Sequence, residues 1–307
     1  MTAVIPTLRS ETGWADYCEF HRLQLDCGDV DPVYPVLRHI GELMDLDEEA
    51  RLWLTLLHVA YYHLGSALAA FEATGGRCEM PPAELVLPTG VERRAHRDHR
   101  QLRAHLRSLT DRAASYGGLT RWLRLGTASN PTLNWQILTD VVASVHGNGR
   151  WATFKTLEML ATVNGFPLAA PDMGHENSTG PRHGLDVLYE HVPDGNGREV
   201  IAALNDLSER HVAALRSAGL DARLETAETT LCDWHAVTAG RYYCGHDVDQ
   251  MLDQLRRSPT YLDGAAMIAR AECFDPRLLG ERQGWPGVRK ELNRLYRDER
   301  ILRWWER

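Results

Sequence analysis

A glycine turn followed at once by a helix is the segment of this chain best suited to hold an anion. Two glycines one residue apart form a tight turn that exposes backbone N–H groups, and the helix begins with its N-terminus facing that turn. We therefore predict that a phosphate binds this segment, which consists of Gly147, Asn148, Gly149, Arg150 and Trp151. A helix–helix turn without any ligand is the alternative.

The loop from residue 171 to residue 184 concentrates carboxylate, imidazole and hydroxyl groups on one irregular segment. Asp172 follows Pro171 at its start, about twenty residues after the glycine turn. A carboxylate there can act as a general base or stabilise a developing positive charge. His175 is a second group for proton transfer. The alternative role of Asp172 is to cap the loop backbone.

A second polar segment lies between Gly240 and Asp247. Arg241 can clamp a phosphate, Tyr243 can stack on a base or hydrogen-bond to it, and His246 stands beside Asp247 at a predicted helix start. A packed aromatic turn, with Asp247 as a helix cap, is the alternative interpretation.

Two further groups of residues could contact a ligand. Tyr62, His63 and Ser66 fall within one helical turn, where a small residue lets a ligand approach; core packing is the alternative. A basic run could follow a phosphate backbone or simply be a solvated face. Its members are Arg93, Arg94, His96, Arg97, His99, Arg100, Arg103, His105 and Arg107.

Composition is that of an ordinary globular protein of 307 residues, with a net charge of −8. This charge argues against indiscriminate nucleic-acid binding. No signal peptide or membrane span is recognised, and the scattered cysteines indicate reduced thiols, so we expect a cytoplasmic protein. Four residues offer thiols and imidazoles to zinc, but their spacing is unlike that of zinc motifs, and no metal site is predicted. They are Cys232, His235, Cys244 and His246.

Almost every segment has helical periodicity, and no alternating strand extends over five residues. The predicted class is all-α, as one compact body in which N-terminal helices (12–75) pack on a core (91–257) with a C-terminal extension (258–307). The predicted helices span 14–26, a segment ending near 44, 47–72, 91–114, 119–125, 130–146, 151–164, 184–191, 198–218, 247–257 and 288–307.

The glycine turn, the helix and the later Pro-Asp resemble the helix-hairpin-helix DNA glycosylases. In those proteins the hairpin holds the DNA backbone, and an aspartate at this later position faces the extruded nucleotide. Glycosylases that also cut the strand carry a lysine nucleophile near the position of Trp151. Because this chain has tryptophan there, Schiff-base chemistry is not expected.

Four motifs together resemble the amino acid:DNA transferases, also called α-glutamyl/putrescinyl thymine pyrophosphorylases, of phage DNA hypermodification. They are DPVYPVL (31–37), LLHVAYYHLGSA (56–67), GNGRWATFKTLEML (147–160) with PDMGHE (171–176), and LCDWHAVTAGRYYCGHD (231–247). The resemblance implies a helix-hairpin-helix glycosylase-like bundle. It also implies a transferase that acts on double-stranded DNA containing 5-pyrophosphoryloxymethyl-uracil, in which an amino acid such as glycine displaces pyrophosphate.

The resemblance also suggests roles for the candidate residues. Asp172 is the proposed base that deprotonates the amine, with His175 and His63 as substitutes, while Mg²⁺ is an optional cofactor for the pyrophosphate. The residues expected to bind DNA, pyrophosphate or the amino acid are Gly147, Asn148, Gly149, Arg150, Trp151, Lys155, Tyr62, Arg241, Tyr243, His246 and Asp247.

Three other functions remain open at this stage. A glycosylase would use the same turn and Asp172 but release a modified base and leave an abasic site. A non-catalytic DNA- or protein-binding component would need the turn and the basic run, but not the polar loop. A zinc-stabilised module would be revealed by metal analysis.

Overall fold

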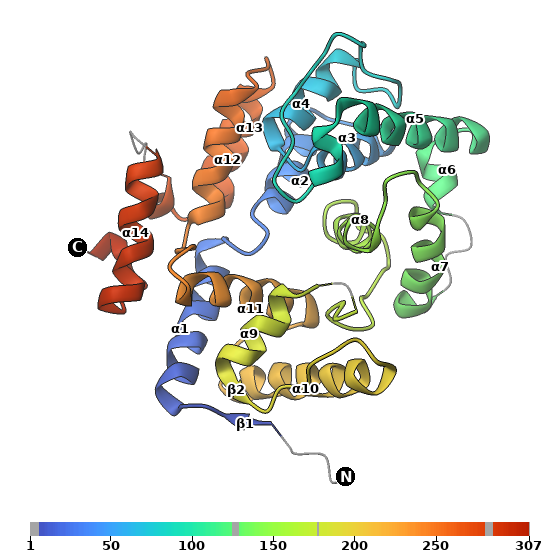
Figure 1. Ribbon diagram of the computed structural model, residues 1–307. Coiled ribbons are helices and arrows are strands. Elements are labelled where there is room, and N and C mark those ends of the chain that lie inside the picture. Colours follow the sequence, from blue (N-terminus) through green and yellow to red (C-terminus); the bar gives the residue numbers. More distant parts are fainter. Residues whose placement is uncertain (1–5, 125–128, 177, 280–284, 307) are drawn as a thin grey trace. The chain divides into compact units, whose positions relative to one another are not determined.

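The computed structural model describes residues 6–124, 129–176, 178–279 and 285–306, and this part of the chain is all-α, as predicted (Figure 1). Two predicted helix ends, Leu125 and Arg307, and position 177 of the predicted polar loop lie outside the described residues. The first elements are β1 (Thr7–Leu8), α1 (Glu11–Cys27), α2 (Val33–Leu43), α3 (Glu48–Tyr61), α4 (Leu64–Ala73), η1 (Arg94–Arg97), α5 (His99–Tyr116), α6 (Leu119–Leu123) and α7 (Pro131–Ala143). The others are α8 (Arg150–Thr162), α9 (Gly180–Leu188), β2 (Tyr189–Glu190), α10 (Arg198–Ser217), α11 (Leu224–Thr238), α12 (His246–Arg257), α13 (Asp263–Cys273), η2 (Pro276–Leu278), α14 (Trp285–Glu299) and η3 (Trp304–Glu306).

The chain divides into two compact units that alternate along the sequence. The first unit comprises residues 1–31, 172–248 and 274–307, and the second comprises 32–171 and 249–273. Asp172 therefore belongs to the first unit and the glycine turn to the second. The expectation that both form one body stays a prediction.

Helix α11 is the centre of the first unit, where it packs against α9, α1, α14 and α10. Its crossing with α9 is close because Gly184 has no side chain: a Cβ there would overlap the carbonyl oxygen of Leu231. Strand β1 pairs antiparallel with β2, Thr7 opposite Glu190 and Leu8 opposite Tyr189. The buried core includes Tyr17, Phe20, Leu185, Leu207, Leu231 and Trp234.

Helix α3 has the same central place in the second unit, where it packs against α4, α8, α6, α5 and α2. The sequence analysis predicted one helix over 47–72, and this was wrong: the helix breaks at Tyr62, whose φ of 46° is left-handed. The carbonyl of Tyr61 accepts a hydrogen bond from Gly90 N–H (2.8 Å). His63 then caps α4, because its Nδ1 accepts the backbone N–H of Ser66 (3.1 Å).

The single helix predicted over 91–114 is also divided. Asp98 ends η1 and caps α5, since its side chain accepts the backbone N–H of Arg100 (2.9 Å). Two helices, α11 and α13, were missed. In α11 the apolar residues Ala227, Leu231, Trp234 and Val237 do recur at helical spacing, but the polar Glu228, Thr229 and Thr230 are buried beside them, so the contrast between an apolar and a polar face is weak. Among the described helices, none has the length and apolar character that crossing a membrane requires.

Candidate functional site

The predicted glycine turn joins α7 to α8 in the second unit. Gly147 takes a left-handed φ of 79°, and the Asn148 side chain holds the turn by donating to the carbonyl oxygen of Val142 (3.0 Å). Gly149 is the N-cap of α8 and supplies no side-chain acceptor. The first backbone N–H groups of a helix have no acceptor within the helix, so the start of α8 suits an anion.

The two glycines of the turn have different reasons to be glycine. A Cβ on Gly147 would lie 3.2 Å from Nε2 of His96, and the φ of this residue also disfavours a side chain. Gly149 has an ordinary φ of −73°, and a Cβ there would meet no atom within 4 Å. The fold therefore requires glycine at 147 alone, and at 149 the missing side chain leaves the start of α8 open to a ligand.

A buried arginine lies behind this turn. Arg93 is 5% exposed and donates from Nη2 to Nε2 of His96 (2.7 Å), while His96 Nδ1–H donates to the carbonyl oxygen of Ala60 (2.6 Å). His105 supports the turn directly by donating from Nδ1 to the carbonyl oxygen of His146 (2.7 Å). The basic run is thus not one solvated face, because these three members are buried.

Burial determines the charges in this group. Desolvation, helped by the charge of Arg93, lowers the pKa of His96 to about 4 and that of His105 to about 3, so both are neutral at pH 7. Desolvation also lowers the pKa of Arg93 to about 10, which leaves it charged. No carboxylate among the described residues pairs with this guanidinium. The region behind the turn therefore carries uncompensated positive charge, which favours an anion.

Tyr62 and Trp151, both predicted to contact substrate, do come together. Their rings are edge to face with centroids 4.8 Å apart, and both side chains are partly exposed. Trp151 stands in the first turn of α8, so this aromatic pair lies at the helix start that the turn leaves open. His63 is adjacent in sequence, but its Nδ1 is occupied as a helix cap, and burial lowers its pKa to about 4.

Lys155 is placed in the interior of the second unit. It is 8% exposed, and its Nζ lies 2.7 Å from Oε2 of Glu158, which also accepts a hydrogen bond from the Tyr34 hydroxyl (2.9 Å). Its charge is therefore already neutralised by Glu158. Contact of Lys155 with substrate stays a prediction.

In the first unit, Asp172 and His175 hold the polar loop against α10. The two carboxylate oxygens of Asp172 accept from Gly174 N–H (2.7 Å) and from the side chain of Asn205 (3.3 Å). His175 is 1% exposed and donates from Nε2 to Ser208 Oγ (2.6 Å). Burial, followed by the charge of Arg182, lowers the pKa of His175 to about 4. Their catalytic roles stay predictions beside these structural ones.

The segment after Gly240 is largely buried apart from its arginine. Arg241 is exposed and donates to Nε2 of His235 (2.9 Å). Tyr243 is 3% exposed and packs in a small apolar cluster of the C-terminal helix region. His246 Nδ1 lies 2.8 Å from a carboxylate oxygen of Asp247. The structure thus gives Tyr243 a packing role, and contact of these four residues with substrate remains a prediction.

Around His246 the fold assembles four carboxylates, of which only Asp247 was predicted from the sequence as a site residue. We call Asp29, Asp31, Asp233 and Asp247 the acidic cluster. Asp29 is fully buried, and its Oδ2 accepts from Gly245 N–H (2.5 Å) at the start of α12, while its Oδ1 has no partner among the described residues. Residues 29 and 31 are neighbours in sequence, but Asp233 and Asp247 join them only in the fold.

Desolvation dominates the electrostatics of the acidic cluster. It raises the pKa of Asp29 and of Asp233 well above the usual carboxyl range, and the charge of Asp247 raises both further. Backbone N–H groups of Gly245 and Val248 oppose the shift at Asp29. In the described part of the chain, no three His, Cys, Asp or Glu side chains come together in a way that could hold a metal ion. Because burial favours the protonated forms of Asp29 and Asp233, the cluster is suited to binding a proton.

These features define a class: an all-α protein with an uncapped helix start that suits an anion in one unit and buried carboxylates in the other. The family model of amino acid:DNA transferases matches residues 26–243, well over half of the chain. The chain therefore belongs to the amino acid:DNA transferase family, and it is a transferase that acts on DNA with an amino acid. The matched range contains the glycine turn, the polar loop, and Asp29, Asp31 and Asp233 of the acidic cluster.

The different roles of the two glycines can be separated by mutation. Gly149→Ala should leave the unfolding free energy nearly unchanged and weaken binding to duplex DNA about tenfold, since a methyl group would stand in front of the α8 amides. Gly147→Ala should instead destabilise the fold by about 1 kcal/mol or more. Fluorescence anisotropy at fixed salt and urea unfolding measure the two effects.

The matched control is Gly197→Ala, because Gly197 is the N-cap of α10, has an ordinary φ of −68°, and would place its Cβ in open space. It should change neither DNA binding nor stability by much. Equal DNA affinity of the Gly149→Ala variant and the unmodified protein would remove the turn from the DNA interface.

The raised pKa of Asp29 predicts an unusual dependence of stability on pH. A carboxyl group with a raised folded-state pKa contributes stability while protonated, and this contribution is lost as pH rises from its unfolded-state pKa through its folded-state pKa. Asp29→Asn should therefore stabilise the protein at pH 8 by about 1 kcal/mol or more, the equivalent of one pKa unit. The advantage should shrink toward pH 5. Urea unfolding at both pH values tests this, and a difference that is the same at both contradicts the assignment.

Proposed function

We propose that this transferase joins the amine of an amino acid, with glycine the first to test, to 5-pyrophosphoryloxymethyl-uracil in phage DNA. A C–N bond forms at the exocyclic carbon of the base, the C–O bond to pyrophosphate breaks, and pyrophosphate leaves with the bonding electrons. The amine loses one proton in the process. The base stays attached to its sugar, which distinguishes this reaction from that of a glycosylase.

The open start of α8 is the observation that carries this proposal. Both the DNA backbone and the leaving pyrophosphate are anions, and helix amides backed by the uncompensated charge of Arg93 stabilise such groups. The exposed Arg150 follows Gly149 directly and is the first residue of α8. Tyr62 and Trp151 offer ring surface beside it, where an extruded base could stack.

The amine needs a base, because amino groups are largely protonated at neutral pH. Asp172 is the candidate from the sequence. The structure adds Asp233, whose Oδ2 has no partner among the described residues and whose pKa is raised above the ordinary carboxyl range by burial, which makes it a stronger base than an ordinary carboxylate.

A product assay tests the proposed reaction. Purified full-length protein is incubated with DNA containing 5-pyrophosphoryloxymethyl-uracil and with glycine, glutamate or putrescine, then digested to nucleosides for mass spectrometry. We expect a modified nucleoside that carries the added amine, and one pyrophosphate released for each nucleoside that is modified. DNA containing 5-hydroxymethyl-uracil, which lacks the leaving group, is the control. Abasic sites would indicate a glycosylase instead, and unchanged nucleosides with folded protein would reject the transfer.

The identity of the base can be tested with two isosteric variants. If Asp233 accepts the proton, Asp233→Asn should lower kcat about a hundredfold or more and abolish the acidic limb of the pH–rate profile. Asp172→Asn retains an oxygen for the Gly174 amide and should then lower the rate much less. The reverse pattern assigns the proton transfer to Asp172, and unchanged profiles in both variants exclude these two carboxylates.

A further inference from the structure

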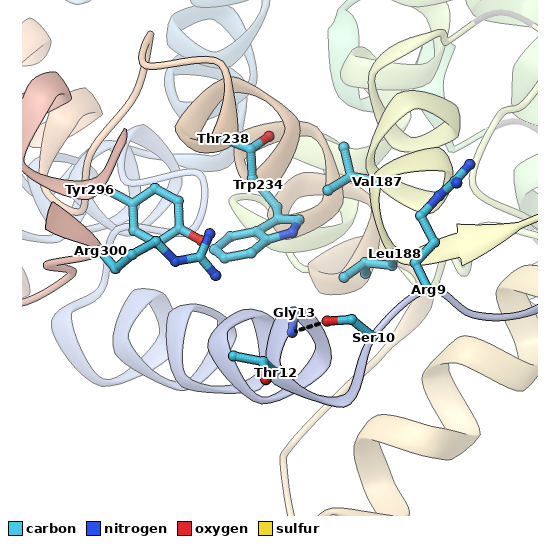
Figure 2. Close-up of a pocket in the computed structure, with 10 residues that line it drawn as sticks. All are labelled: Arg9, Ser10, Thr12, Gly13, Val187, Leu188, Trp234, Thr238, Tyr296 and Arg300. Carbon is cyan, nitrogen blue, oxygen red and sulfur yellow. Dashed lines mark hydrogen bonds between the residues drawn. The ribbon is translucent and has the colours of Figure 1, made fainter. Parts of the chain in front are cut away.

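A cavity of about 220 Å³ lies inside the first unit, apart from the features described above. It is a half-open pocket lined by the start of α1, the end of α9, the C-terminal end of α11 and the end of α14 (Figure 2). Leu188 contributes an apolar wall, and Ser10 and Thr238 contribute hydroxyl groups. The lining thus combines an apolar surface with a few polar groups, as small-molecule sites do.

Two buried hydrogen-bond donors belong to this lining. Trp234 is 1% exposed and Tyr296 is 3% exposed, and neither the indole N–H nor the phenolic hydroxyl has a partner among the described residues. Figure 2 shows the hydroxyl of Tyr296 turned toward the indole of Trp234, and the indole nitrogen turned toward the other lining residues. Burial raises the pKa of Tyr296 to about 12, so this hydroxyl keeps its proton at neutral pH. Buried polar groups normally have a partner, so these two donors point to an acceptor ligand.

The two arginines beside the cavity offer guanidinium N–H donors to a carboxylate. Arg9 and Arg300 belong to the lining, and none of the lining residues in the described part of the chain is acidic. Each guanidinium also pairs with an acid outside the lining, Arg9 with Asp186 and Arg300 with Asp16, which keeps them in place. The N-terminus of α1, a helix of 17 residues capped by Ser10, adds the positive end of its dipole.

We propose that this cavity binds a small organic carboxylate through the Trp234 indole N–H, the Tyr296 hydroxyl and the Arg300 guanidinium. Its volume equals that of about seven water molecules, which suits a ligand the size of a small amino acid. Arg300, Tyr296 and the α1 start all lie outside residues 26–243. Trp234 and Thr238 lie inside that range, so the site combines the matched part of the chain with segments outside it, and it does not depend on the proposed reaction.

Saturation-transfer NMR on the purified full-length protein without DNA tests this site. The probes are acetate, propionate, glycine and glutamate, with acetamide and glycinamide as matched molecules that lack the carboxylate. We expect saturable binding of the carboxylates, and binding of the two amides weaker by about tenfold or more. Tighter binding of glycine and glutamate than of acetate and propionate identifies amino acids as the source of the carboxylate, and the reverse identifies simple acids.

Substitutions of lining residues test whether the carboxylate binds in this cavity. Tyr296→Phe removes one buried donor without changing the ring, so the protein should remain folded and lose about tenfold in carboxylate affinity. Trp234→Phe should weaken binding similarly. Tyr261→Phe, at a tyrosine that is 72% exposed in the second unit, is the control and should bind normally. Absence of saturable carboxylate binding, equal binding of the amides, or full affinity in the Tyr296→Phe variant overturns the proposal.

Discussion

The uncapped start of α8 is the structural feature on which the proposed function most depends. Its first amides have no side-chain cap, and the guanidinium of Arg93 behind the turn has no carboxylate partner among the described residues. Both features cost stability unless an anion is nearby. The surrounding elements nevertheless maintain them: His105 holds the turn, and the carbonyl of Ala60 orients the histidine that accepts from Arg93. The fold therefore preserves an incomplete electrostatic arrangement that an anionic ligand can complete.

The first unit has the opposite electrostatic imbalance, because its described part contains buried acceptors without donors. In the acidic cluster, oxygen atoms of Asp29 and Asp233 lack donors, and their pKa values rise because burial and mutual repulsion disfavour the charged forms. The two reactants of the proposed transfer are stabilised by opposite electrostatic environments, and each environment is present in one of the units. DNA and pyrophosphate need positive charge, whereas an ammonium group needs acceptors that can take its proton. Each unit thus suits one reactant by its electrostatics alone.

The sequence predicted the all-α class and the position of the glycine turn, because both depend on local signals: apolar periodicity and glycine spacing. Predictions from the sequence failed where contacts between distant segments determine the structure. The break at Tyr62 depends on Gly90, which binds the carbonyl that a continuous helix would use. Helix α11 was missed because its central place in the unit buries polar residues such as Thr230. The acidic cluster joins Asp29 to Asp233, some two hundred residues later in the chain, and no local pattern reveals that contact.

The residues of the candidate site could therefore be predicted from the sequence, but the burial and hydrogen bonding of each residue could not. Arg93 and Arg97 look alike in the basic run, yet one is buried behind the turn and the other is exposed. Asp172 and Asp233 are both carboxylates near motif residues, yet Asp172 has hydrogen-bond donors on both oxygens and Asp233 lacks one on Oδ2. Residue type decides which chemistry is available, and burial together with hydrogen bonding decides which residue of that type can perform it. For the proposed transfer, burial and hydrogen bonding therefore favour a carboxylate of the acidic cluster over Asp172 of the polar loop as the base.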